Sequence, residues 1–326
     1  MIRSLCEELG MGCFKNPVLI EIKQDMPGFD RFIGSWLFRG KFNILVDVGP
    51  ARTASCLIDS LSAEGLDRVD YILITHVHID HAGGLGDLLD HYPGAIVICH
   101  ERAVKHLVDP SVLWGGSLKT LGKIAEAYGE PRSVEKRRII PHTRCDFEDL
   151  RIIETPGHAF HHLSFSYAGN LFVGEAAGNY FRIGDMEYLR PATPPRFFFD
   201  VCMESLWRLL ELKDQPICFA HFGEAPSSHR LLRVAMNQLF LWKGVISKQL
   251  QVSSKGEAFI KRCLELLIEE DSNLRAFGNM SQESRAREEF FIANSIRGFL
   301  EFLDKDGQGG NRSLENRAKA LIFNKQ

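Results

Sequence analysis

The chain has 326 residues, of which 45% are hydrophobic and 25% are charged. This balance is typical of globular proteins and excludes a disordered chain, a collagen-like repeat and a coiled-coil rod. Lysine and arginine number 39 against 42 aspartates and glutamates, so the net charge is −3 and gives no overall attraction to nucleic acid or anionic lipid.

Short strand-like runs alternate with helix-like runs in the first two thirds of the chain, which is typical of an α/β fold. Strands are predicted at 18–22, 33–38, 43–48, 69–75, 95–99, 151–154, 163–168, 171–174 and 217–220. A helix is predicted at 55–64, ending at Gly65, and another extends to Lys213 with Asp200 as its N-cap.

Beyond Ser228 the apolar residues recur at helical spacing. The predicted helices are residues 229–250, 256–270 and 284–303. The first is apolar on more than one face, so we expect it to be buried on several sides. We therefore predict one domain at 1–228 and a C-terminal helical region at 229–326. We expect the helices of this region to pack beside the active-site edge and to supply a homodimer contact. Residues 304–313 are expected to form a flexible link before a short final helix.

Membrane insertion and export are not indicated by the sequence. Residues 231–250, the most apolar long stretch, include charged and amide side chains that a spanning helix would exclude. Glu7 and Glu8 interrupt the apolar run that a signal peptide needs. The eight cysteines form no CxxC pair, which favours reduced thiols. We therefore expect a cytoplasmic protein.

The strongest chemical signal is the segment THVHIDHAGG at 75–84, directly after a predicted strand. Imidazole and carboxylate groups are ligands for zinc and related divalent ions. Because side chains two residues apart share a face of an extended segment, His76 and His78 can converge on one point. Asp80 and His81 follow at the turn into the next helix.

Three further candidate ligands, His158, Glu175 and His221, also stand at the ends of predicted strands. One histidine at a strand end is usually structural. Five histidines at the ends of successive strands are best explained by one shared edge that forms a site.

In this order and spacing, the segments HVHIDHAGG, TPGHAFHHLSF, GEAAG and CFAHFG resemble the metallo-β-lactamase superfamily over about residues 17–228. The resemblance implies an αββα sandwich with a dinuclear metal site at one edge. The ligands that it implies are His76, His78 and His158 for the first ion, Asp80, His81 and His221 for the second, and Glu175 as the bridging residue.

Glu175 departs from the aspartate that the family usually has at this position. Its side chain is one methylene longer, so it either bridges two ions after a small backbone shift or binds one ion alone. We expect up to two divalent transition-metal ions, with zinc favoured over iron and manganese.

A metal ion lowers the pKa of bound water to near neutrality, and the resulting hydroxide is a nucleophile that needs no serine or cysteine. No GxSxG segment is present. Asp80 is the predicted catalytic residue, binding metal and orienting the hydroxide. The leading prediction is thus a hydrolase of small esters, lactones or thioesters.

The flanking segments favour a resemblance to cytosolic, lactonase-like members. The segment after Glu175, AAGNYFRIGD, lacks the glutathione-binding pattern of glyoxalase II-like thioesterases. We expect Tyr180, Phe197 and Phe199 to line an apolar acyl pocket. Of His161 and His162, one is a candidate for orienting a metal ligand and at least one is expected to be structural.

Three alternatives to this hydrolase remain open. The first is a mononuclear iron dioxygenase resembling persulfide dioxygenases. The second is a phosphodiesterase or nuclease, which the net charge does not favour. The third is a non-catalytic protein that keeps the metal as a structural element. We expect a small-molecule substrate, with neither nucleic acid nor a membrane as partner.

Overall fold

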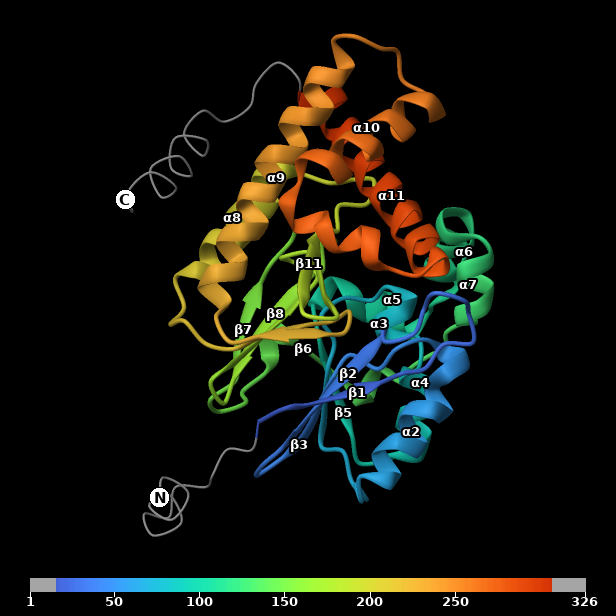
Figure 1. The fold of residues 1–326 in the computed structure, drawn as a ribbon. Coiled ribbons are helices and arrows are strands. Elements are labelled where there is room, and N and C mark those ends of the chain that lie inside the picture. Colours follow the sequence, from blue (N-terminus) through green and yellow to red (C-terminus); the bar gives the residue numbers. More distant parts are fainter. Residues whose placement is uncertain (1–15, 307–326) are drawn as a thin grey trace. The chain divides into compact units, whose positions relative to one another are not determined.

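The computed structural model describes residues 16–306, which form two compact units (Figure 1). The first unit consists of residues up to 152, 163–174 and 216–224, and the second consists of residues 153–162, 175–215 and 225 onward. The chain therefore passes between the units several times, and this division does not coincide with the predicted boundary at 228. The short final helix and most of the predicted link lie outside the described residues.

A six-stranded sheet forms one layer of the first unit, in the order β1-β2-β3-β4-β5-β6. Its strands are β1 (Val18–Glu21), β2 (Gly34–Arg39), β3 (Asn43–Val46), β4 (Tyr71–Leu73), β5 (Ile96–Cys99) and β6 (Ile139–Pro141). The pairs β1–β2 and β2–β3 are antiparallel, and from β3 onward each strand is parallel to the next. The inner parallel strands are almost wholly apolar, as parallel strands covered on both faces require.

The second sheet has the order β13-β12-β9-β8-β7. Its strands are β7 (Arg151–Glu154), β8 (Leu163–Tyr167), β9 (Asn170–Gly174), β12 (Ile217–Phe219) and β13 (Gly223–Ala225). Strands β8 and β9 form a hairpin whose two turn residues, Ala168 and Gly169, both have positive φ, at 48° and 75°. Two consecutive positive φ angles are typical of the tight turn that matches the right-handed twist of paired strands.

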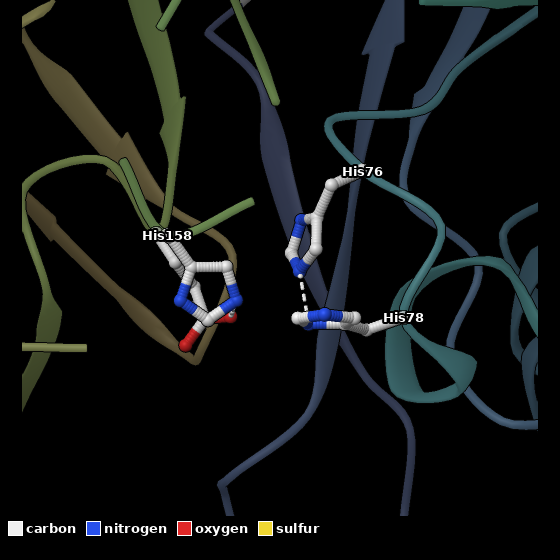
Figure 2. Close-up of side chains that lie close together, drawn as sticks. His76, His78 and His158 are labelled. Carbon is white, nitrogen blue, oxygen red and sulfur yellow. Dashed lines mark hydrogen bonds and ion pairs between the residues drawn. The ribbon is translucent and has the colours of Figure 1, made fainter. Parts of the chain in front are cut away.

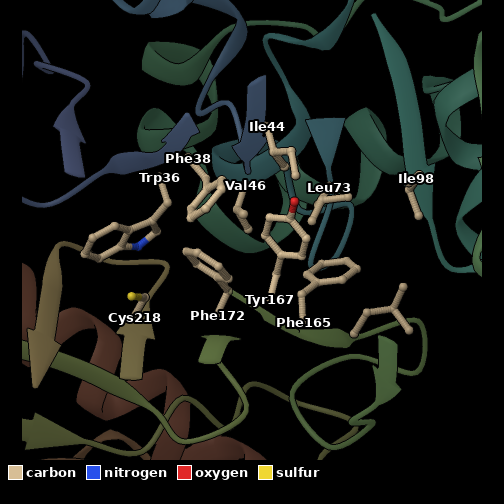
Figure 3. Packing of buried hydrophobic residues seen from close by; sticks show 11 residues of the cluster. Trp36, Phe38, Ile44, Val46, Leu73, Ile98, Phe165, Tyr167, Phe172 and Cys218 are labelled. Carbon is tan, nitrogen blue, oxygen red and sulfur yellow. The ribbon is translucent and has the colours of Figure 1, made fainter. Parts of the chain in front are cut away.

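The hydrophobic core of the first unit combines side chains from both sheets (Figure 3). Trp36 and Phe38 from β2 join Phe165 from β8 and Phe172 from β9. The buried indole of Trp36 donates a hydrogen bond of 2.8 Å to the carbonyl oxygen of Phe219 in β12. The sheets are thus held by burial of large aromatic surfaces, with the one polar indole atom hydrogen-bonded.

Helices of the first unit connect its strands. They are η1 (Ala51–Thr53), α2 (Ala54–Ala63), α3 (Ile79–Ala82), α4 (Leu85–His91), η2 (Glu101–Ala103), α5 (Val104–Val108), α6 (Ser111–Leu121), α7 (Lys123–Tyr128), η3 (Lys136–Arg138) and η4 (His142–Arg144). Helix α2 ends as predicted, because Gly65 has a φ of 69° and the Leu66 amide donates to the Leu61 carbonyl at 3.0 Å.

The second unit combines a hairpin with long helices (Figure 1). Its elements are β10 (Asn179–Ile183), β11 (Met186–Arg190), α8 (Phe199–Leu210), α9 (Ser228–Leu250), α10 (Glu257–Glu270), η5 (Ser272–Asn279) and α11 (Gln282–Asp306). The predicted helices beyond residue 228 are confirmed. The predicted N-cap of α8 is wrong, because Phe198 holds that position and Asp200 lies in the first turn, where its charge still favours the helix dipole.

The cysteines of the described part at positions 56, 99, 145, 202, 218 and 263 are free thiols. Among residues 16–306, no helix is both long and apolar enough to span a bilayer.

Candidate metal centre

The histidine-rich segment begins just after β4 and includes the short helix α3, so it follows a strand as its sequence predicts. His78 is the N-cap of α3, and Asp80 lies within its first turn. A side chain at Gly83 could not be accommodated, because a Cβ atom there would lie 2.3 Å from the carbonyl oxygen of Ile79 and 2.8 Å from the Ala51 amide nitrogen. The glycine therefore allows the backbone at the end of α3 to approach the backbone of Ala51 closely.

His76 and His78 direct ring nitrogens at each other across a short gap (Figure 2). The Nε2 atom of His76 lies 3.0 Å from the Nδ1 atom of His78. Two nitrogens bound to one tetrahedral zinc ion would lie about 3.3 Å apart. The pair thus fits two ligands of one ion with little movement.

Asp80, His81 and His221 form a second group, which lies wholly within the first unit. Their ligand atoms all lie within 4.8 Å of one another. The Oδ2 atom of Asp80 is 3.8 Å from Nε2 of His81 and 3.6 Å from Nε2 of His221. Two imidazoles and a carboxylate are a donor set that suits a divalent transition metal.

Asp47, a buried residue just beyond β3, orients ligands from both parts of the motif. Its Oδ2 atom lies 3.0 Å from Nδ1 of His81 and accepts a hydrogen bond of 2.7 Å from Oγ1 of Thr75. Since that hydroxyl proton is directed to Asp47, Oγ1 of Thr75 accepts from Nδ1 of His76, at 3.0 Å. Both histidines consequently carry their proton on Nδ1 and present an unprotonated Nε2, as metal ligands must.

The role of Asp47 was not predicted from the sequence. Its signal is a single aspartate in the otherwise apolar run 44–48, ILVDV. A carboxylate at the end of a buried strand needs partners, and the Thr75 amide supplies a further one at 2.8 Å.

His221 is oriented in the same way by the backbone. Its Nδ1 atom lies 3.2 Å from the carbonyl oxygen of Phe32, whose ring packs 4.5 Å from the imidazole. A carbonyl oxygen only accepts, so Nδ1 carries the proton and Nε2 faces Asp80.

His158 and Glu175 lie in the second unit, where Nε2 of His158 is 2.8 Å from Oε2 of Glu175. The Nδ1 atom of His158 donates to the carbonyl oxygen of Ala192 at 2.9 Å, which again leaves Nε2 as the ligand atom. The backbone amide of Glu175 donates to Nε2 of His162 at 3.0 Å, and Nδ1 of His162 bonds Thr155 at 2.8 Å. Of the two candidate orienting histidines, His162 therefore holds the backbone of a predicted ligand.

The seven predicted ligands are divided between the units. Asp80, His81 and His221 come together with the His76–His78 pair in the first unit, and the His158–Glu175 pair belongs to the second. That the two pairs bind one ion stays a prediction.

The three aromatic residues predicted to line a pocket are buried in the second unit. Phe197 lies in ring contact with Phe299, and Phe199 stacks on Phe302. The hydroxyl of Tyr180 donates to Glu187 at 2.7 Å, and burial together with this carboxylate raises the pKa of Tyr180 to about 12. All three side chains pack in the interior of the second unit, and their contribution to a substrate pocket stays a prediction.

Phe160 is an exposed aromatic residue that was not among the predicted site residues. It lies two positions after His158, is 51% exposed and packs its ring 5.3 Å from that of Phe198. A large apolar side chain on the loop of a metal ligand is a candidate contact for an apolar substrate group.

A separate pair of stacked imidazoles, His100 and His142, does not suit a metal ion. Their ring centroids are 4.5 Å apart, and their Nδ1 atoms accept backbone hydrogen bonds of 3.0 and 3.1 Å from Arg102 and Glu101. A neutral imidazole that accepts at Nδ1 carries its proton on Nε2, so neither ring offers that nitrogen to a metal.

Several known proteins are similar to this chain. A model of the metallo-β-lactamase superfamily matches residues 30–221. The metallo-β-lactamase fold-containing protein ST1585 of Sulfurisphaera tokodaii is 32% identical over 197 residues, which cover 56% of this chain and 69% of that protein. A hydroxyacylglutathione hydrolase of Pectobacterium atrosepticum is 28% identical over 187 residues, covering 57% of this chain and 60% of the hydrolase.

A solved structure of an archaeal protein, ST1585 from Sulfolobus tokodaii, matches 88% of this chain and 99% of its own length with a TM-score of 0.63. At 24% identity in that superposition, the likeness shows a shared fold.

Proposed function

We propose that this chain, which belongs to the metallo-β-lactamase superfamily, is a metal-dependent hydrolase of a small ester, lactone or thioester. The observation that carries the proposal is the group of Asp80, His81 and His221, in which Asp47 and a backbone carbonyl leave both imidazoles ready to bind a metal. Zinc is the expected metal, with two ions per chain.

Divalent ions supply two kinds of chemistry when bound here: they lower the pKa of water so that it attacks at neutral pH, and they polarise a carbonyl group. The residues of the chain supply orientation. Asp80 would help to hold an ion and would accept a hydrogen bond from the attacking water, while Asp47 keeps His81 in the tautomer that would bind metal. No serine or cysteine nucleophile is required.

Two observations favour particular carbonyl substrates within this class. The relative named hydroxyacylglutathione hydrolase favours thioesters within the proposed class. The exposed ring of Phe160, beside His158, favours an apolar acyl group. A lactonase-like preference and a cytoplasmic location stay predictions.

The test is hydrolysis by protein loaded separately with zinc, manganese or iron. The substrates are p-nitrophenyl acetate, a γ-lactone, a glutathione thioester and bis(p-nitrophenyl) phosphate, and oxygen consumption with a persulfide is measured in parallel. We expect turnover of a carbonyl substrate that is lost in His81→Ala. Turnover of the phosphodiester alone, or oxygen consumption with the persulfide alone, would overturn the proposal.

A further inference from the structure

A short segment that begins with the last residue of β11, residues 190–194 or RPATP, connects a predicted metal ligand to the C-terminal helix α11. We call this segment the strap. Its central residue, Ala192, accepts the hydrogen bond from Nδ1 of His158 at 2.9 Å. The whole connection lies within the second unit.

Ser295 of α11 binds the strap on both sides of Ala192. Its buried hydroxyl donates to the carbonyl oxygen of Pro191 at 3.1 Å and accepts from the Thr193 amide at 3.3 Å. The side chain of Thr193 donates in turn to the backbone carbonyl of Ser295 at 3.3 Å.

These bonds act on His158 through a single peptide group. The Thr193 amide and the Ala192 carbonyl belong to the same planar trans unit, so they point in opposite directions. Fixing the amide on Ser295 therefore aims the carbonyl away from α11, and that carbonyl holds Nδ1 of His158.

Helix α11 lies so close to the strap that one helical position must be glycine. A Cβ atom at Gly298 would lie 1.9 Å from the carbonyl oxygen of Thr193 and 2.8 Å from that of Pro194. Contact at this distance prevents the strap from relaxing toward the helix.

The first residue of the strap is tied to the same helix by buried charges. Nε of Arg190 lies 2.5 Å from Oε2 of Glu288, which also accepts from the Tyr188 hydroxyl at 3.0 Å. Nε of Arg287 bonds the other carboxylate oxygen at 2.9 Å. The strap is thus anchored at residue 190 and again on either side of Ala192.

We propose that α11 is a positioning element of the metal centre, in which Ser295 aims the Ala192 carbonyl at His158 and so holds its Nε2 in place for an ion. The inference rests on the proposed function only in taking His158 as a metal ligand. It makes the C-terminal helix a part of the site and Ser295 a positioning residue 137 positions from the histidine that it serves.

The test is the zinc affinity of Ser295→Ala, measured on the full chain by competition with a chromophoric chelator in the absence of substrate. Loss of an orienting group beside a metal-ligating histidine weakens binding by about 10–100-fold. We expect a loss of about tenfold for one ion only, with the ion on Asp80, His81 and His221 unaffected. His158→Ala should weaken the same ion more strongly.

Two controls separate positioning from general damage to the helix. Ser284→Ala makes the same change near the start of α11, where the serine hydroxyl accepts a hydrogen bond from Ser281, and should bind zinc like the unchanged chain. Thr193→Val removes the hydroxyl that bonds the Ser295 carbonyl but keeps the Thr193 amide on the Ser295 side chain, and should lower zinc affinity less than Ser295→Ala does. If Ser295→Ala does not fold, Ser295→Cys keeps a weaker donor and acceptor at the same place and should show a smaller loss.

Zinc binding by Ser295→Ala equal to that of Ser284→Ala, while His158→Ala loses an ion, would overturn the inference and leave the proposed function intact. The expected loss of affinity in a chain that hydrolyses none of the carbonyl substrates would support the inference and refute the proposed function.

Discussion

At the scale of single residues, polar side chains outside the predicted ligand set orient the predicted ligands. Asp47 accepts the amide and hydroxyl of Thr75 as well as Nδ1–H of His81, three donors on one carboxylate. An asparagine offers one acceptor oxygen and a donor amide in its place, so one of these donors would meet another donor.

We therefore expect Asp47→Asn to weaken the ion on Asp80, His81 and His221 by about 10–100-fold. Zinc content after dialysis against a chelator measures this loss. Asp70→Asn is the matched control. Asp70 directly precedes β4 and also accepts a backbone hydrogen bond, from the Asn43 amide at 2.8 Å. Equal zinc content in the two variants would contradict the role of Asp47.

Glu175 tests how many ions the centre binds. Its carboxylate contacts His158 at 2.8 Å, while His162 fixes its backbone amide. Glu175→Ala should lower the zinc content by one ion, because the anionic ligand is lost, whereas Glu175→Asp should keep two. Metal analysis of both variants decides this, and full zinc content in the alanine variant would show that Glu175 is no ligand.

At the scale of elements, helix α11 is joined to the β10–β11 hairpin by a buried charge network. Burial by itself raises the pKa of Glu288, but the guanidinium groups of Arg190 and Arg287 outweigh this and hold the pKa below its usual value. A lowered carboxyl pKa stabilises the fold above the unfolded pKa, and this contribution is lost as pH falls through the folded pKa.

Glu288→Gln should lower the free energy of unfolding by about 3–5 kcal/mol at pH 7, because Arg190 stays buried without its counter-charge. Urea unfolding at several pH values measures the effect. The deficit should be constant down to about pH 5 and shrink below the ordinary glutamate pKa of about 4.3. Glu289→Gln, which changes the exposed neighbour, should have no such effect. A deficit that persists unchanged at pH 3 would contradict this account.

At the scale of the whole molecule, the chain builds its two units from interleaved segments. Gly174 ends β9 in the first unit, and the next residue, Glu175, already belongs to the second. Removal of the chain beyond Ser228 would therefore take α9, α10 and α11 from a unit that also contains two predicted ligands. The C-terminal helices are consequently not a detachable appendage.

The association of two chains through these helices stays a prediction. Light scattering of the full chain at several concentrations should give the mass of two chains. Phe290 is an apolar residue of α11 that is 37% exposed, and Phe290→Asp should lower the measured mass to that of one chain. The mass of a single chain at every concentration would exclude the homodimer.

The sequence by itself determined most strands, the long C-terminal helices and the candidate ligand positions. His76 and His78 are two residues apart on an extended segment, and each remaining predicted ligand stands at a strand end or helix start, so local spacing was sufficient to select them as candidates. Hydrophobic periodicity likewise located the helices beyond residue 228, because the apolar face of a helix is determined by the spacing of residues within its own segment.

Only the tertiary structure decided what orients those ligands. Asp47 meets His81 across 34 positions, Ala192 meets His158 across 34, and Ser295 meets Thr193 across 102. Such hydrogen bonds leave no periodic pattern in the sequence. Each joins one aspartate, alanine carbonyl or serine to a partner that is distant in the sequence and near only in the fold. The boundary between the units escaped prediction for the same reason: compactness depends on which distant segments pack together, and composition changes only once, near residue 228.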